Sequence, residues 1–374
     1  MKIAITGGLG FIGLNLARRL ATEGHELLLI DSLTQQIHGA LPQVDIPDGV
    51  TVERVDVREI AQRSELIEGC DAVFHLAAET GTGQSMYQIQ QYVSVNDLGT
   101  AALLEAISAC KRRPRRIILA SSRSVYGEGA YIHPKRHGEL VYPQTRSAQS
   151  MRDGEWNHIG ADGVALVATN TPETAPVMPG SVYAATKAAQ ELLITASAAA
   201  LGLTSIVLRF QNVYGEGQSL RNPYTGIISI FFNRARQGLE IPIYEDGLES
   251  RDFVHVDDVV DVLVSALSAD VQSGSVINVG SGQPTSVRTL AETLLSISGL
   301  SVPVRITGQF RIGDIRHCYA DITRMRNLLG ISPRIALRQG LERFVAWAKK
   351  QPTYEDHSER AAQELRTKGL TNEQ

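Results

Sequence analysis

A glycine-rich segment near the start of the chain limits the possible folds most strongly. The apolar run of residues 2–6 leads directly into Gly8-Leu9-Gly10-Phe11-Ile12-Gly13, and a helical pattern follows. Glycines between a strand and a helix allow a tight turn, let a pyrophosphate approach the N–H groups of the helix N-terminus, and let helix and strand pack closely. The pattern GxGxxG is weak evidence alone, because glycine loops also form for turn reasons. Its position after the first strand predicts a dinucleotide-binding fold.

Strand-like and helical patterns alternate over roughly the first half of the chain. The strand-like runs are residues 2–6, 26–30, 51–55, 72–76, 115–120 and 205–208. The amphipathic segments are residues 11–21, 59–67, 93–109 and 182–200. Near-continuous apolar strands that alternate with helices predict an α/β fold of Rossmann type, with a doubly wound parallel sheet covered on both faces.

Breaks in this alternation suggest how the chain is divided. We expect a nucleotide-binding domain over residues 1–212, with an insertion at 128–180 beside the active site, because that stretch is polar and longer than usual connections. Irregular patterns over 213–250 and 283–350 predict a smaller, mixed C-terminal lobe in two parts. Residues 251–282, with strands at 253–256 and 276–279, are expected to return to the main sheet. Residues 351–374 lack a clear core-facing stripe, which predicts a peripheral helix or a loose tail.

Composition excludes several other classes. The 374 residues are 43% hydrophobic and 20% charged, as in soluble globular proteins, and the net charge of −4 favours neither nucleic acid nor anionic membranes as partners. No run approaches the ~18 apolar residues of a membrane span, and no signal peptide is apparent. The three cysteines, Cys70, Cys110 and Cys318, form no CxxC pair, which argues against disulfides or a zinc ribbon. We therefore expect a cytoplasmic protein.

Two acidic residues follow strands where a dinucleotide would lie. Asp31 ends the second strand, near the ~20-residue offset of the carboxylate that accepts ribose hydroxyls. No arginine follows it to hold a 2′-phosphate, so NAD is favoured over NADP. Asp56 follows the third strand. It could contact the adenine or cap a helix that starts at Arg58, and both interpretations stay open.

Tyr183-Ala184-Ala185-Thr186-Lys187 places a phenol and an ammonium one helical turn apart. A cation beside a phenol favours the phenolate and lowers the pKa of the hydroxyl, which suits acid–base work. The spacing YxxxK is common by chance. It gains weight because Ser121-Ser122 ends the run 115–120, at the edge of a parallel sheet where ligands bind.

Many short motifs, taken together and in order, resemble the NAD-dependent epimerases and dehydratases of the extended short-chain dehydrogenase/reductase superfamily. The likeness covers about residues 1–347. The motifs are Gly7-x-x-Gly10-x-x-Gly13, Asp31, Asp56-Val57, His75-Leu76-Ala77-Ala78, Asn96, Ser121-Ser122-x-x-Val125-Tyr126-Gly127, Tyr183-x-x-x-Lys187, Leu208-Arg209-x-x-Asn212-Val213-Tyr214-Gly215, Arg251-Asp252-Phe253-Val254-His255-Val256 and Asn278-Val279-Gly280.

The resemblance implies roles for individual residues. Tyr183 is the acid/base on a sugar hydroxyl, Lys187 holds the nicotinamide ribose and tunes Tyr183, and Ser122 hydrogen-bonds the reacting oxygen. The implied NAD contacts, besides Tyr183 and Lys187, are Gly7, Gly10, Phe11, Ile12, Gly13, Asp31, Asp56, Val57, Leu76, Ala77, Ala78 and Asn96.

The resemblance also implies a nucleotide-diphospho-sugar substrate. Its contacts, besides Ser122 and Tyr183, are Arg123, Asn212, Arg251, Arg311 and Asp314. Arginine forks pair well with the phosphate oxygens that such a substrate carries. Each arginine could instead be an ordinary solvated charge.

Arg123-Ser124 bears on the reaction, because the 4,6-dehydratases of the family carry an Asp-Glu pair there. A sugar 4-epimerase that works through a transient 4-keto sugar needs the fewest groups: one base, one hydroxyl partner and a tightly bound NAD. A decarboxylase, a dehydratase, a 4-keto reductase and a non-catalytic NAD sensor remain alternatives.

Three segments most resemble 4-epimerases of the dTDP-L-rhamnose 4-epimerase type: residues 121–129, 222–226 and 313–318. In such relatives the insertion would carry cysteine pairs. Here His133, His137 and His158 stand without cysteine, so we predict no metal. Members of this family also pair the helices that match 93–109 and 182–200, which implies a homodimer.

The first prediction concerns Asp31. We expect the protein to bind NAD in preference to NADP, and Asp31→Ala to weaken NAD binding by ~1.5–3 kcal/mol, because a charged hydrogen bond to the ribose is lost. Titration calorimetry with both dinucleotides measures this. Tighter binding of NADP by the unaltered protein would contradict our interpretation of Asp31.

Overall fold

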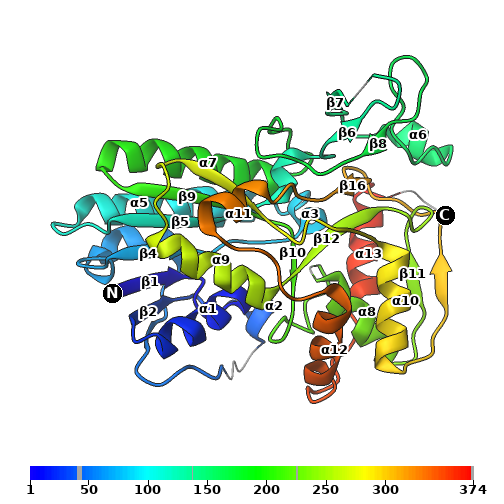
Figure 1. The fold of residues 1–374 in the computed structure, drawn as a ribbon. Coiled ribbons are helices and arrows are strands. Elements are labelled where there is room, and N and C mark those ends of the chain that lie inside the picture. Colours follow the sequence, from blue (N-terminus) through cyan, green and yellow to red (C-terminus); the bar gives the residue numbers. More distant parts are fainter. Residues whose placement is uncertain (40–43, 137, 225, 372–374) are drawn as a thin grey trace.

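Seven parallel strands form the central sheet (Figure 1). The computed structural model describes residues 1–39, 44–136, 138–224 and 226–371. The strand order is β13-β9-β5-β4-β1-β2-β3. The bounds are β1 Lys2–Thr6, β2 Glu26–Ile30, β3 Thr51–Glu53, β4 Ala72–His75, β5 Arg116–Ser122, β9 Thr204–Phe210 and β13 Ser275–Val279. The predicted doubly wound α/β class is confirmed.

Helices cover both faces of this sheet. On one face, α1 (Phe11–Thr22) and α9 (Val256–Ser268) share a core with the strands. On the other, η1 (Val57–Leu66), α5 (Gly99–Ala109) and α7 (Val182–Leu201) form a second core. The strands are apolar along their whole length because each is buried on both sides.

Two predicted helices differ from expectation. The stretch 59–67 lies in η1, a 3₁₀ helix with a kink at Arg63 instead of a regular α-helix. The stretch 93–109 begins with a π-helical turn, η2 (Val93–Leu98), and becomes α-helical only at Gly99. Short helical pieces stand nearby: α2 (Gln35–His38), α3 (Thr82–Ser85), α4 (Ile89–Tyr92) and η3 (Arg123–Tyr126).

The second lobe is mixed, as predicted. Its four-stranded sheet contains β10 (Asn212–Tyr214), β12 (Ser250–His255), β14 (Pro284–Ser286) and β16 (His317–Cys318). A separate pair joins β11 (Ile241–Ile243) to β15 (Val304–Ile306). Helices α8 (Ile227–Arg236), α10 (Val287–Ser298) and α12 (Leu337–Ala348) enclose the apolar core of this lobe.

The prediction that residues 251–282 return to the main sheet is correct only for β13. Strand β12 pairs with β10 in the smaller sheet instead. The buried carboxylate of Asp252 explains its place, because it accepts hydrogen bonds from the backbone N–H groups of Ser281, Gly282 and Ala320. Helix α11 (Thr323–Leu329) follows and contacts β13.

The insertion 128–180 forms a small sheet of its own, at the upper right of Figure 1. The strands of this sheet are β6 (Tyr131–Ile132), β7 (Leu140–Val141) and β8 (Val167–Ala168), and the insertion also contains the short helix α6 (Ala148–Arg152). A buried ion pair ties it to the second lobe, because Arg146 donates to both carboxylate oxygens of Glu245 at 2.8 Å.

Of the two expectations for the C-terminal segment, a peripheral helix or a loose tail, the structure shows a helix. The segment contains α13 (Ser358–Thr367), red in Figure 1, which packs against the body of the protein. Its buried stripe is only two residues, Ala361 and Leu365, one turn apart. So short a stripe in a charged helix is easily missed in the sequence.

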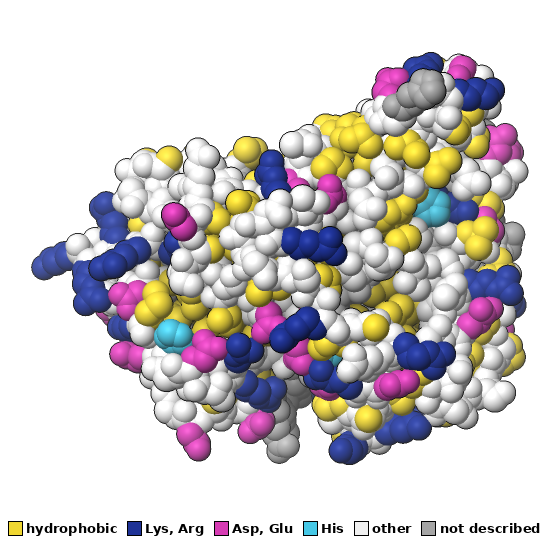
Figure 2. Space-filling model, in the orientation of Figure 1, with side chains coloured by type: hydrophobic (Ala, Val, Ile, Leu, Met, Phe, Trp, Pro, Cys, Tyr) yellow, Lys and Arg dark blue, Asp and Glu magenta, His cyan; other side chains and the backbone are white. Residues whose placement is uncertain are grey.

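The surface carries both signs of charge. Positive and negative side chains are interspersed over the face in Figure 2, in keeping with the net charge of −4. Among the described residues, no helix has both the length and the apolar character needed to span a membrane.

We propose that the chain forms a homodimer through α4, η2 and α7. These neighbouring elements expose Ile89, Val93, Leu98 and Leu192, the last with 73% of its surface accessible. Leu192→Glu is expected to give a monomer by light scattering, because a charge would be buried in the interface. Leu328→Glu on α11 is the matched control and should stay dimeric. A wild-type monomer at micromolar concentration would contradict the proposal.

Candidate active site

A cavity of about 1080 Å³ lies at the carboxyl ends of the parallel strands and extends into the second lobe. Ligands of open parallel sheets bind at this edge. The structure brings nearly all predicted site residues to its wall: Gly7, Gly10, Phe11, Ile12, Gly13, Asp31, Asp56, Val57, Leu76, Ala77, Ala78, Ser122, Arg123, Tyr183, Lys187, Asn212, Arg251, Arg311 and Asp314. Asn96 is the exception.

The glycine loop is so tightly packed that side chains are excluded. A Cβ on Gly7, where φ is +68°, would stand 2.7 Å from the backbone nitrogen of Ala77. A Cβ on Gly13 would stand 2.4 Å from the carbonyl oxygen of Gly7. Gly10 precedes α1 without a side-chain cap, so the helix N-terminus faces the cavity with free N–H groups. This cradle fits a pyrophosphate.

Asp31 holds the loop and faces the cavity at the same time. Its two carboxylate oxygens accept hydrogen bonds from the N–H groups of Leu9 at 3.0 Å and Leu33 at 2.8 Å. Each oxygen keeps a further lone pair, which can accept a ribose hydroxyl.

Of the two roles left open for Asp56, the structure shows the helix cap, and contact with the adenine stays a prediction. It caps η1 by accepting the N–H of Arg58, and it also lines the cavity. The hydrogen bond from the Arg58 side chain lowers the pKa of the Asp56 carboxyl. The carboxylate therefore stays ionised beside the cavity.

Asn96 is fully buried and lies behind the wall. Its amide exchanges two hydrogen bonds with the backbone of Glu79, at 2.8 and 3.1 Å, and donates a third to Thr186. It therefore holds the loop after β4 against α7 and does not itself line the cavity, and its contact with the cofactor stays a prediction. These partners are distant in sequence, so the motif alone cannot identify this role.

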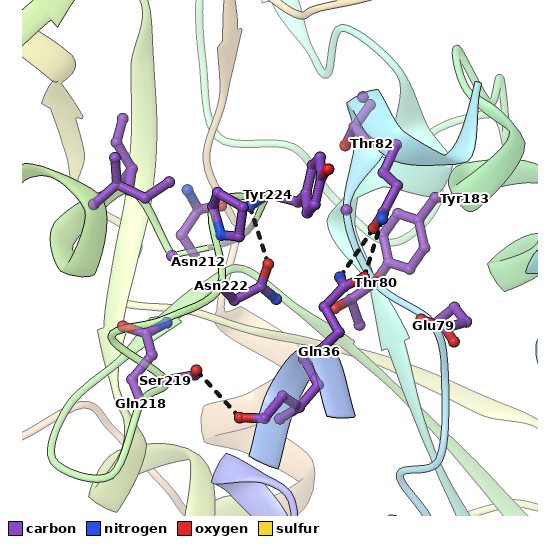
Figure 3. Close-up of a pocket in the computed structure, with 18 of the residues that line it drawn as sticks. Gln36, Glu79, Thr80, Thr82, Tyr183, Asn212, Gln218, Ser219, Asn222 and Tyr224 are labelled. Carbon is purple, nitrogen blue, oxygen red and sulfur yellow. Dashed lines mark hydrogen bonds between the residues drawn. The ribbon is translucent and has the colours of Figure 1, made fainter. Parts of the chain in front are cut away.

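Tyr183 lies in the first turn of α7, where Ser181 caps the helix by accepting the N–H of Ala184. In Figure 3 its ring lies on one side of the cavity with Thr80, and Asn212 lies on the other. Burial raises the pKa of Tyr183, while its hydrogen bond with Ser122 and the charge of Arg123 oppose that shift. The phenol thus lies beside the two groups that favour its ionised form.

Lys187 is almost completely buried one turn further along α7. Its Nζ donates to Oε1 of Gln190 at 2.7 Å, and Nε2 of Gln190 donates to Thr100 at 2.7 Å. Burial lowers the pKa of Lys187 to about 7. Sequence reasoning missed Gln190, although its i, i+3 spacing from Lys187 on one helix face was a usable signal.

A buried ion pair fixes α7 to the sheet below these residues. Arg209 on β9 donates to both oxygens of Glu191 on α7, at 2.9 and 2.7 Å. Ser121 on β5 donates to the same carboxylate, and the Arg209 guanidinium lies 4.6 Å from the ring centre of Tyr126. The pair joins the elements that carry Ser122 and Tyr183.

Arginines dominate the part of the cavity in the second lobe. Arg251 donates to Asp314 at 3.0 Å and also to three backbone carbonyls, so most of its donors are used within the protein. Arg311 lies over the ring of Tyr244, and Arg123 donates to Oδ1 of Asn212 at 3.4 Å.

These charges also set the ionisation of Asp314. Burial would raise the pKa of Asp314, but the surrounding arginines, with Arg251 foremost, lower it. Asp314 therefore stays ionised among four arginines, Arg251, Arg311, Arg146 and Arg123. Such a site suits a diphosphate.

The cavity also contains residues that the sequence did not indicate. They come from the loop after β4, from the segment before α8 and from α13; examples are Glu79, Thr80, Thr82, Asn222 and Tyr224 (Figure 3). Residues 76–78 of the loop after β4 were expected to contact NAD, and the later residues could have been anticipated too, because the loop leaves the carboxyl edge of the sheet beside β1.

The insertion histidines bind carboxylates instead of one another. His133 lies 3.0 Å from Asp162, and His158 lies 3.1 Å from Glu128. His137 lies outside the described residues. Within the described part of the chain, the one acidic group with suitable geometry for a metal is Glu245, Asp246 and Glu249. Two of these carboxylates already accept hydrogen bonds from Arg316. The absence of a metal stays a prediction.

Comparison with known proteins identifies similar chains along almost the whole length. A model of the NAD dependent epimerase/dehydratase family matches residues 3–150 and 160–280. A dTDP-L-rhamnose 4-epimerase of Burkholderia thailandensis is 37% identical over 353 residues, which cover 94% of this chain and 95% of that protein. A dTDP-glucose 4,6-dehydratase of Streptomyces niveus is 29% identical and covers 93% and 92% of the two chains.

Solved structures agree with this. The UDP-glucose 4-epimerase of Thermotoga maritima with UDP-glucose has a TM-score of 0.76 at 27% identity, covering 94% of this chain and 99% of that one. The UDP-glucuronic acid 4-epimerase of Bacillus cereus, in complex with UDP-glucuronic acid and NAD, has a TM-score of 0.74 at 26% identity and the same coverage.

The buried Lys187 generates a prediction about stability. Its pKa is lowered from the ordinary lysine range to about 7, so the penalty for burying the charge is complete below about pH 7 and decreases as the pH rises. The stability advantage of Lys187→Met over wild type should be largest at and below about pH 7 and should decrease by up to ~1.4 kcal/mol per pH unit above it. Denaturant unfolding at several pH values measures this.

Lys349→Met is the matched control, because Lys349 is exposed on the surface. It should show no such dependence on pH. A constant stability difference between Lys187→Met and wild type over this range would contradict a buried, destabilised ammonium.

Proposed function

The chain belongs to the NAD dependent epimerase/dehydratase family, and on this premise we propose that it is a nucleotide-diphospho-sugar 4-epimerase. The family, the isomerase class and NAD as cofactor were all predicted from the sequence, and the matches confirm them. The observation that carries the finer proposal is the combination of Ser122, Tyr183 and Lys187 in one cavity with Arg123-Ser124 beside them.

The residues present fit NAD. The glycine cradle accommodates its pyrophosphate, Asp31 its adenosine ribose, and Lys187 its nicotinamide ribose. When bound, NAD supplies the redox chemistry: a hydride is taken from C4 of the sugar and afterwards given back to the opposite face of the ring.

Tyr183 is the acid/base in this proposal. It removes the proton from O4 of the sugar and later returns it. Ser122 holds the same oxygen, and its neighbours keep it in place, because Ser124 donates to the Ser122 hydroxyl through Oγ at 2.9 Å and through its N–H at 3.2 Å. Acid–base groups of this kind contribute ~10²–10⁴-fold to the rate.

The second lobe anchors the other end of the substrate. Arg311, Arg251 and Arg123 provide positive charge for a diphosphate, with Asn212 beside them. An anchored diphosphate leaves the 4-keto sugar free to turn over, and the large cavity offers the space. The dTDP-L-rhamnose 4-epimerase relative makes a deoxythymidine nucleotide of a 6-deoxysugar the first substrate to try.

The alternatives within the family need an additional acid near C5 and C6, or a different substrate. The 4,6-dehydratases of the family carry an Asp-Glu pair directly after the serine, where this chain has Arg123-Ser124. Arg123 and Ser124 are instead engaged with Asn212 and Ser122. This arrangement favours the epimerase.

A panel of nucleotide sugars in D₂O tests the proposal. With the right substrate, NMR should show inversion at C4 and no deuterium at C3, C4 or C5, because the hydrogen at C4 leaves and returns as hydride. Deuterium at C3 or C5 would indicate a 3,5-type epimerase, and loss of a water mass would indicate a dehydratase.

Tyr183→Phe is the matched variant for this experiment. It should keep the fold and bound NAD but lose ~10²–10⁴-fold in rate, because only the phenolic oxygen is removed. Near-normal turnover in Tyr183→Phe would remove the acid/base from the mechanism.

A further inference from the structure

The C-terminal segment, residues 351–371, forms one wall of the active-site cavity. Residues 358–363, 365 and 366 of α13 line the same cavity as Tyr183 and Arg311. The roles assigned so far to the glycine loop, the Tyr183 helix and the arginines do not involve this segment. Its contacts explain how it is held there.

One carboxylate in α13 joins the two lobes. Oε2 of Glu364 accepts hydrogen bonds from the hydroxyl of Tyr87 at 2.9 Å and from the hydroxyl of Tyr224 at 2.8 Å. Tyr87 follows α3 in the nucleotide-binding domain, whereas Tyr224 precedes α8 in the second lobe. The hydrogen bonds from Tyr224 and Tyr87 lower the pKa of Glu364, so it accepts both bonds as a carboxylate.

The same segment supports the loop that carries Arg311. The N–H of Ile312 donates to the carbonyl of Leu370 at 2.9 Å, and Arg311 forms an antiparallel bridge with Thr371. Asp314 follows on the same loop, three residues after Arg311. The C-terminal segment therefore orders one of the loops that face the substrate.

The two attachments of α13 differ in strength. Towards the second lobe, Arg234 forms a buried ion pair with Asp356, with side chains only 4% and 9% exposed, and also donates to Ser358. Towards the nucleotide-binding domain, Glu364 is 35% exposed, and Leu365 packs over Gly83. The contact with Tyr87 and Gly83 is thus the one that can open.

We propose that residues 351–371 are part of the nucleotide-sugar site: they position the Arg311 loop, and they close the cavity through Glu364 after the substrate enters. The identity of the ligand rests on the function proposed above. Closure retains the 4-keto sugar while it turns over and excludes water from it. Glu364 is a positioning residue, because it acts through the two tyrosines and not on the sugar.

Hydrogen exchange of the full-length protein, with its cofactor as purified, tests the closure directly. The probes are dTDP and UDP, followed by the corresponding nucleotide sugars. Backbone amides of residues 358–371 should exchange more slowly when a nucleotide is bound. Unchanged exchange in this segment under saturating nucleotide would overturn the proposal.

Substitution of Glu364 tests the positioning role. Glu364→Ala should raise the Kd for the nucleoside diphosphate and the KM for the nucleotide sugar about tenfold, with a smaller effect on kcat, because a charged acceptor shared by both lobes is lost. Glu364→Gln should recover part of this affinity. Glu342→Gln, at an exposed glutamate on α12 that does not line the cavity, is the control and should behave as wild type. Equal Kd values for all three variants would overturn the proposal.

These measurements separate the two proposals. Weaker nucleoside diphosphate binding in Glu364→Ala and slower exchange on binding do not require epimerisation. If no nucleotide sugar is epimerised but both effects appear, the proposed function fails and the role of the C-terminal segment stands.

Discussion

The buried ion pair between Glu191 and Arg209 holds the catalytic arrangement together. Both charges are removed from water, so each depends on the other, and loss of one partner of such a pair costs ~3–5 kcal/mol. Because the pair connects α7 to β9, and Ser121 connects it to β5, it determines where the first turn of α7 lies relative to the end of β5. Tyr183 meets Ser122 as a consequence.

With α7 held in this position, the cavity has two chemically different ends. In the proposed function, proton transfer belongs to Tyr183; burial opposes its ionisation, and the neighbouring Ser122 and Arg123 favour it. The same proposal assigns phosphate recognition to the second lobe, where several arginines surround the carboxylate of Asp314. A nucleotide sugar that spans both ends presents its sugar to Tyr183. The C-terminal helix covers this arrangement and connects the two lobes through Glu364.

Local rules in the sequence predicted the features that depend on neighbouring residues or on sheet geometry. The strands were recognisable because both of their faces are buried, and Gly7 and Gly13 because any side chain there would meet the backbone. Features that depend on distant partners were not predictable. Asn96 binds Glu79 and Thr186, and the place of β12 depends on hydrogen bonds from Asp252 to residues near 281 and 320. The place of helix α13 in the cavity wall was not predictable, because only Ala361 and Leu365 are buried.

The central claim is that one hydrogen leaves C4 and returns to the same carbon of the same molecule. A substrate that carries deuterium at C4 and carbon-13 in the sugar, mixed with unlabelled substrate, tests it by mass spectrometry. If the hydride returns to the carbon it left, deuterium stays on the carbon-13 sugar at C4 in the inverted product. Deuterium found on the unlabelled sugar, or lost to water, would contradict it.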